Sequence, residues 1–201
     1  GIGGIATYPS VIPASPSLKH TLSVVAHEWI HNYMIFHSLG QNYWASSEMT
    51  SLNETAADIV GNYIGDKVYR LYYADEQYAS EASQSVVVDV EVTRQLFDFN
   101  HEMRDTRLMV DKMLSEGTIE RAEAYMDKRR LLFVENGFFL RELNQAFFAF
   151  NGTYADNPAS ISPIGDQLKQ VREQSRSLKQ FIETISGISN YGQLLSLIKY
   201  N

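Results

Sequence analysis

Two histidines one helical turn apart are the residues of this chain best suited to chemistry. Residues 27 to 31 spell H-E-W-I-H, an H-E-x-x-H pattern that follows an apolar run. On a helix, His27 and His31 project from the same face, and two imidazoles at this spacing can hold one Zn²⁺. Glu28 lies beside them, where it can take a proton from a water molecule activated by the metal. The pattern predicts a hydrolytic zinc site.

A second acidic stretch supplies a further ligand. Residues 52 to 58 spell L-N-E-T-A-A-D, and Glu54 is the natural third ligand. Three protein ligands leave the fourth position open for water, which is the arrangement of a catalytic zinc site. Asp58 follows Glu54 by four residues and shares its helical face. It could accept a hydrogen bond from the free ring N–H of a ligand histidine.

Together the two motifs resemble those of the gluzincins, the thermolysin-like clan of zinc metallopeptidases. In that family H-E-x-x-H lies on one helix and N-E-x-x-x-D on the next, and the likeness covers roughly residues 20 to 65. The resemblance implies three zinc ligands, which are His27, His31 and Glu54. It also implies that Glu28 is the general base, that Asp58 orients His27 and that Asn53 supports His31.

The tyrosine or histidine that usually stabilises the oxyanion in this family cannot be located by a motif. Two candidates are Tyr154, in a polar loop that contains proline, and His101, on a predicted helix. Several charged residues surround His101, so an ion-paired helix surface is the favoured alternative for it.

His37 offers an alternative third ligand. It follows His31 by six residues, which is the spacing of the metzincin pattern H-E-x-x-H-x-x-G-x-x-H. That pattern needs a glycine where the chain leaves the helix, because glycine adopts positive φ at no steric cost. Met34 stands at this place. We therefore expect the helix to continue to about Leu39, which directs His37 away from His27 and His31.

Apolar periodicity predicts that most of the chain is helical. Ser15 and Pro16 suit the start of the first helix, which should end near Gly40. The second helix should span about residues 47–73, with Gly61 and Gly65 allowing close packing against a neighbour. Further helices are expected at 86–114, 118–135, 138–150, 166–185 and 191–200.

Two short stretches are expected to lie outside these helices. The composition of residues 1–12 predicts a short strand or hairpin arm. The resemblance to gluzincins implies that Gly3 to Tyr8 form an edge strand beside the metal, which could pair with the backbone of an extended peptide. Tyr43 and Trp44 lie in the loop between the two motif helices. They could border the cleft, although a place over the core is favoured for both.

The predicted fold is mainly α with a small β portion (α+β), in which a zincin-like metal helix pair precedes a helical C-terminal half. A length of 201 residues favours a single domain, with a zinc-site part at 1–73 and a helical part at 86–201. Five phenylalanines between 138 and 150 are expected to fill its core.

Composition narrows the classes of partner. A net charge of −7 disfavours nucleic acid and anionic membrane surfaces as partners. The chain has no cysteine, so a metal site must use histidine and carboxylate ligands. No apolar run is long enough to span a membrane. Because the chain begins with Gly1, we expect it to be a portion of a longer protein, whose other part could carry an export signal or a membrane anchor.

The sequence therefore predicts a zinc metallopeptidase that acts on a peptide or protein substrate, with Zn²⁺ as cofactor. One alternative is a catalytically inactive zinc-binding domain. In that domain the zinc would be structural or vestigial, and the helical second half would bind a protein partner. Another alternative is a helical scaffold that holds no metal.

Overall fold

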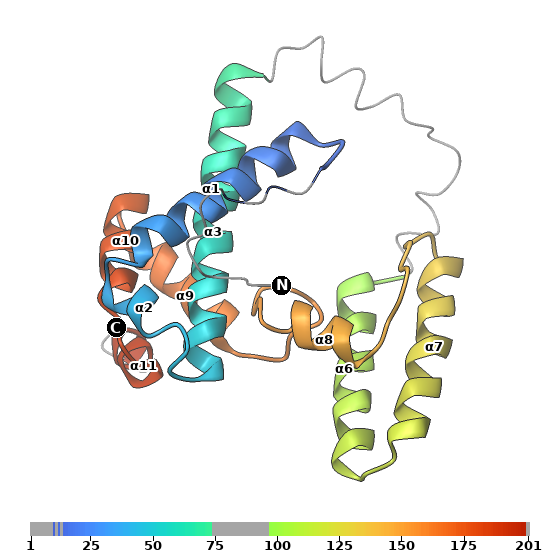
Figure 1. The fold of residues 1–201 in the computed structure, drawn as a ribbon. Coiled ribbons are helices and arrows are strands. Elements are labelled where there is room, and N and C mark those ends of the chain that lie inside the picture. The colour runs from blue at the N-terminus through green and yellow to red at the C-terminus, as the bar shows by residue number, and fades with distance from the viewer. Residues whose placement is uncertain (1–9, 11, 13, 74–96, 200–201) are drawn as a thin grey trace. The chain divides into compact units, whose positions relative to one another are not determined.

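The computed structural model is mainly α-helical, as the sequence predicts (Figure 1). It describes residues 10, 12, 14–73 and 97–199, and within these ranges the backbone forms helices, turns and bends but no strand. The expected edge strand at Gly3 to Tyr8 lies outside the described residues. The chain divides into two compact units, and each is described below by itself. The first comprises Gly1–Ala79 with Pro163–Asn201, and the second comprises Ser80–Ser162.

The first motif lies on helix α1, Leu18–Met34. Its N-cap is Ser17, whose hydroxyl accepts a hydrogen bond from the His20 amide, so the helix starts slightly later than predicted. The helix also ends earlier, at Met34 rather than near Leu39. The chain reverses there and forms the short helix α2, Ser38–Gln41. Gly40 packs so tightly on the end of α1 that a Cβ would lie 2.2 Å from the Met34 carbonyl oxygen, and only glycine permits this approach.

The second motif lies on helix α3, Ser47–Tyr72, with bounds close to those predicted. Its N-cap hydroxyl, from Ser46, accepts a hydrogen bond from the Met49 amide. In Figure 1, α1 crosses α3, and this is the most extensive contact between helices in the described part of the chain.

Two glycines of α3 let the helices approach this closely, as the sequence suggests. A Cβ on Gly61 would lie 2.7 Å from the Ser23 carbonyl oxygen and 3.0 Å from the His27 Cβ. A Cβ on Gly65 would lie 2.6 Å from the Ser23 amide nitrogen. Because these neighbours are mostly backbone atoms of α1, the crossing tolerates no side chain at either glycine.

Three C-terminal helices complete the first unit: α9 (Ile164–Gln174), α10 (Leu178–Ser186) and α11 (Tyr191–Lys199), and all three contact α3. The single helix expected at 166–185 is therefore wrong. Ser175 is extended and its hydroxyl bonds back to the Val171 carbonyl, while Ser177 caps α10. The largest fully buried side chains of this unit form its core: Ile30, Met34, Leu39, Met49, Leu52, Ile164, Leu168, Phe181 and Ile185.

Residues 163–201 thus pack with the zinc-site motifs, whereas the sequence-based division grouped them with 86–162. Periodicity shows which face of a helix is apolar, but it does not show which distant helix covers that face.

The second unit is built on two helices, α6 (Phe99–Ser115) and α7 (Ile119–Glu135). Of the helix expected at 86–114, residues 86–96 lie outside the described residues. Helix α6 begins at Phe99, because Asp98 is its N-cap residue. The Asp98 carboxylate accepts hydrogen bonds from the backbone amides of Asn100 and His101. Gly117 connects the pair with a φ of +72°, which a larger residue rarely adopts. The limits of α7 agree with the predicted range 118–135.

The helix expected at 138–150 is wrong for its first half. Gly137 has a φ of +83° and ends the preceding helix, so the chain stays irregular until helix α8, Gln145–Asn151, begins. The Asn144 side chain caps α8 by accepting from the Phe147 amide. The predicted burial of all five phenylalanines is also wrong, because Phe139 is 87% exposed and Phe150 is 60% exposed.

None of the helices in the described ranges combines the length and the apolar character that a membrane span requires.

We expect Gly61→Ala to lower the free energy of unfolding by about 1–3 kcal/mol, because the added methyl group would overlap backbone atoms of α1. Urea denaturation followed by circular dichroism measures the change. Gly187→Ala is the matched control, since the nearest atom to a Cβ there is 3.7 Å away. Equal stability of Gly61→Ala and the unaltered protein would contradict the close crossing of α1 and α3.

Candidate metal centre

His27 and His31 converge at the crossing of α1 and α3. Their Nε2 atoms lie 3.0 Å apart and the ring centroids 4.7 Å apart, with the rings nearly perpendicular. Both residues are buried, at 8% and 2% exposure. A spacing of four residues places the two rings on one helical face, as expected from the H-E-x-x-H pattern.

Glu54 reaches the same place from α3. Its Oε2 atom lies 3.5 Å from His27 Nε2 and 3.6 Å from His31 Nε2. The residue is 1% exposed, and Oε2 is buried without a hydrogen-bond partner. In the described part of the chain, these three residues are the group of histidines and acids whose donor atoms could together hold a metal ion. A buried carboxylate oxygen that lacks a donor is costly unless a cation binds it.

The spacing of the three donor atoms fits zinc. A triangle with sides of 3.0, 3.5 and 3.6 Å has its centre about 2.0 Å from each corner, which matches Zn–N and Zn–O bond lengths. Two imidazoles with one carboxylate also form a ligand set that binds Zn²⁺ well. The residues present therefore fit the metal that the motifs imply.

Comparisons with known proteins neither support nor oppose this assignment. No family model, curated protein or solved structure matches the chain. The likeness to gluzincins therefore rests on the two sequence motifs and stays a prediction.

Asp58 orients the ring of His27. Its Oδ1 atom lies 2.8 Å from His27 Nδ1, so the ring N–H donates to the carboxylate. The other ring nitrogen, Nε2, faces His31 and Glu54. A carboxylate behind a ligand histidine sets the tautomer that a metal requires and makes the imidazole a better donor.

Asn53 makes a different contact from the one that the resemblance implies. Its side-chain amide donates to the Leu39 carbonyl at 3.3 Å, which ties α3 to α2. No hydrogen bond joins it to His31: Asn53 Oδ1 and His31 Nδ1 are both buried without a partner. Asn53 thus holds the segment that follows α1, rather than the imidazole itself.

Glu28 is half-buried, and its carboxylate forms no hydrogen bond or ion pair with any described residue. Its backbone carbonyl accepts a hydrogen bond of 3.0 Å from the side-chain amide of Asn32. A carboxylate that is not held by neighbours can accept and return a proton, as a general base must.

His37 lies outside the group of ligand atoms. It is the N-cap residue of α2, and its ring centroid is 4.3 Å from that of Tyr33. The helix ends before His37 rather than after it. The outcome nevertheless agrees with the expectation that His37 is not the third ligand.

The candidate oxyanion donors, His101 and Tyr154, belong to the second unit. His101 lies on the surface of α6, where Nδ1 is 3.5 Å from an Asp105 carboxylate oxygen. The centroids of the Tyr154 and Phe150 rings lie 5.9 Å apart. Their role in catalysis stays a prediction.

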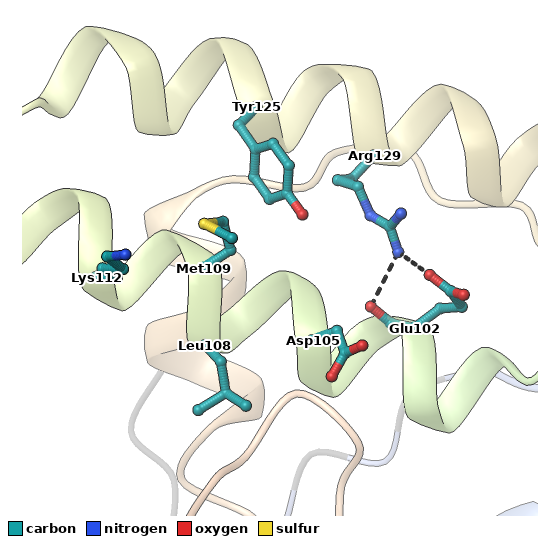
Figure 2. Close-up of a pocket in the computed structure, with 7 residues that line it drawn as sticks. All are labelled: Glu102, Asp105, Leu108, Met109, Lys112, Tyr125 and Arg129. Carbon is teal, nitrogen blue, oxygen red and sulfur yellow. Dashed lines mark hydrogen bonds and ion pairs between the residues drawn. The ribbon is translucent and has the colours of Figure 1, made fainter.

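A pocket of about 420 Å³ lies between α6 and α7 in the second unit (Figure 2). Figure 2 shows Arg129 turned toward Glu102, whose carboxylate and backbone carbonyl both accept from it. Tyr125 projects between the helices above Met109. Because Arg129 and Glu102 are paired with each other, this pocket has the character of an ion-paired helix interface rather than of a second reactive site.

Tyr43 is the site residue that sequence reasoning did not assign. It is 5% exposed, and its hydroxyl donates to Glu54 Oε1 at 2.6 Å. The neighbouring Trp44 is 68% exposed. The only available signal was that Tyr43 lies in the short connection between the two motifs, and no spacing rule links a loop tyrosine to a ligand.

Electrostatics couple these groups in the metal-free protein. Burial lowers the pKa of His27, but its hydrogen bond to Asp58 and the nearby negative charge of Glu54 outweigh this effect and raise the pKa to about 9. Burial raises the pKa of Glu54, yet the two histidines and the Tyr43 hydroxyl hold it well below its usual range. A protonated His27 thus balances the carboxylates until a metal cation replaces the proton.

We expect the metal-free protein to lose stability as the pH rises from 6.5 to about 9. The pKa of His27 is higher in the folded chain than the value of 6.5 for an unperturbed histidine. Its contribution is therefore complete below pH 6.5 and is lost as the pH passes the folded-state value. Melting temperatures in the presence of a chelator measure this slope. His27→Gln should flatten it, and an unchanged slope in that variant would assign the effect to another group.

Proposed function

We propose that this chain is a zinc-dependent peptidase, in which His27, His31 and Glu54 hold the metal. The observation that carries the proposal is the convergence of three buried donor atoms on a point with zinc bond lengths. The unpartnered Glu54 Oε2 gives independent support, because a bound cation removes the cost of burying it.

When bound, Zn²⁺ supplies Lewis-acid chemistry: it lowers the pKa of a water molecule to about 7 and polarises a carbonyl. The residues of the chain supply the remaining functions. With the metal bound, His27 would offer Nε2 as the donor atom, because its other ring nitrogen donates to Asp58. Glu28 accepts a proton as water attacks the scissile carbonyl, and then delivers that proton to the leaving amine.

The finer features of the gluzincin resemblance belong to the same proposal. An edge strand at Gly3 to Tyr8 would form the small β portion and pair with the backbone of the peptide substrate. The helix pair α1 and α3 would be the zincin-like part of the fold. A histidine or tyrosine, with His101 and Tyr154 as candidates, would assist in stabilising the oxyanion.

We expect Glu28→Ala to keep stoichiometric zinc and to lower the hydrolysis of a peptide library by about 10²–10⁴-fold, because only the proton acceptor is lost. Elemental analysis and a fluorogenic peptide assay measure the two properties. Glu173→Ala is the control, since Glu173 is an exposed acid of the same unit. Retained hydrolysis in Glu28→Ala would show that another base acts. Zinc without any hydrolysis in the unaltered protein would favour the inactive zinc-binding alternative.

We expect His27→Ala and Glu54→Ala each to reduce zinc content from near one ion per chain to background, because two ligands hold zinc far more weakly than three. Metal analysis after extensive dialysis measures the content. His37→Ala and His20→Ala should keep the metal. Loss of zinc in His37→Ala would instead support the metzincin-like ligand set, and a zinc-free unaltered protein would support the helical scaffold.

A further inference from the structure

The two oxygens of Glu54 have different surroundings. Oε1 accepts a short hydrogen bond of 2.6 Å from the Tyr43 hydroxyl. Oε2 has no hydrogen-bond partner and lies within 3.6 Å of both histidine Nε2 atoms. A hydrogen bond from a neutral hydroxyl to an ionised carboxylate is short and directional, so it holds the carboxylate in one orientation.

Tyr43 is itself held at two points by α3. Its backbone carbonyl accepts a hydrogen bond of 2.7 Å from the Thr50 hydroxyl, and its own hydroxyl donates to Glu54. Thr50 and Glu54 are four residues apart and therefore lie on one face of the helix. The residue thus spans one turn of α3 and keeps a constant position relative to the carboxylate.

The packing around Tyr43 leaves it little freedom. The side chain is buried, and its ring meets that of Trp44 edge to face at 4.7 Å. Its backbone amide bonds to the Gly40 carbonyl at 3.2 Å, within the turn that follows α2. A phenol fixed in this way does not have to lose rotamer entropy when a metal binds.

We propose that Tyr43 is a positioning residue of the metal centre. Its hydroxyl donates a hydrogen bond to Oε1 of Glu54, so the carboxylate would offer only Oε2 to the metal. A coordination position would then stay open for water or substrate. This inference rests on the proposed metal centre but not on peptide hydrolysis. Tyr43 takes no part in the chemistry itself, because it acts through the ligand that it orients.

The test is the zinc affinity of Tyr43→Phe, which removes the hydroxyl and keeps the ring. We expect zinc to bind about 10- to 100-fold more weakly, as measured by competition with a chromophoric chelator. Tyr191→Phe is the matched control. Its hydroxyl also donates one hydrogen bond, to Gln167 at 3.0 Å, but that partner is not a ligand, so the affinity should not change.

A second readout separates positioning from a merely structural role. The Co²⁺-substituted Tyr43→Phe protein should show weaker visible absorption bands than the unaltered protein, because Glu54 can then offer both oxygens and raise the coordination number. In a Glu54→Gln background, Tyr43→Phe should have little further effect on zinc affinity, since the group that it orients is already altered.

The outcomes distinguish this inference from the proposed function. If the unaltered protein binds no zinc, both are overturned. If it binds zinc and Tyr43→Phe has the same affinity and Co²⁺ spectrum, only the role of Tyr43 is overturned. Should Tyr43→Phe fail to fold, Thr50→Val decides instead. It releases the backbone of Tyr43 and should weaken zinc binding in the same direction, whereas an unchanged affinity in that variant overturns the inference.

Discussion

The close crossing of α1 and α3 is the constraint on which the candidate metal centre depends. Gly61 lies against the backbone of His27. Because glycine has no side chain, α1 can approach α3 closely at this point, and this approach determines how near the His27 imidazole lies to α3. Glu54 lies on the same helix, about two turns earlier, and reaches both rings. A side chain at the crossing would separate the helices and with them the three donor atoms.

The centre is also an electrostatic compromise. Two imidazoles and one carboxylate are buried together, and each of them is costly to bury alone. Asp58 and Tyr43 satisfy one atom of His27 and one of Glu54. His31 Nδ1 and Asn53 Oδ1 stay buried without a partner, and so does Glu54 Oε2, which faces the two histidine Nε2 atoms. The unpartnered Glu54 oxygen is the one of these atoms that the proposed metal would satisfy.

The sequence predicted the parts of this arrangement that depend on local spacing. The bounds of α3, the shared face of His27 and His31 and the role of Gly61 and Gly65 all follow from helical periodicity or residue size. The sequence did not predict the break at Ser175 or the irregular chain before α8. At both places a polar side chain, of Ser175 or Asn144, hydrogen-bonds to the backbone, and apolar periodicity does not record such bonds. Tyr43 was missed because its contact depends on how a loop folds back on α3, which no periodicity records.

All the residues that build the centre come from one uninterrupted stretch between His27 and Asp58. Helices α9 to α11, which pack on α3, come from the other end of the chain, after the whole second unit. The contacts among the three proposed ligands therefore join residues that are close in the sequence. The contacts of α9 to α11 with α3 join residues that are far apart in the sequence. During synthesis the two imidazoles and the carboxylate can therefore come together before the helices that later pack on α3 have been made.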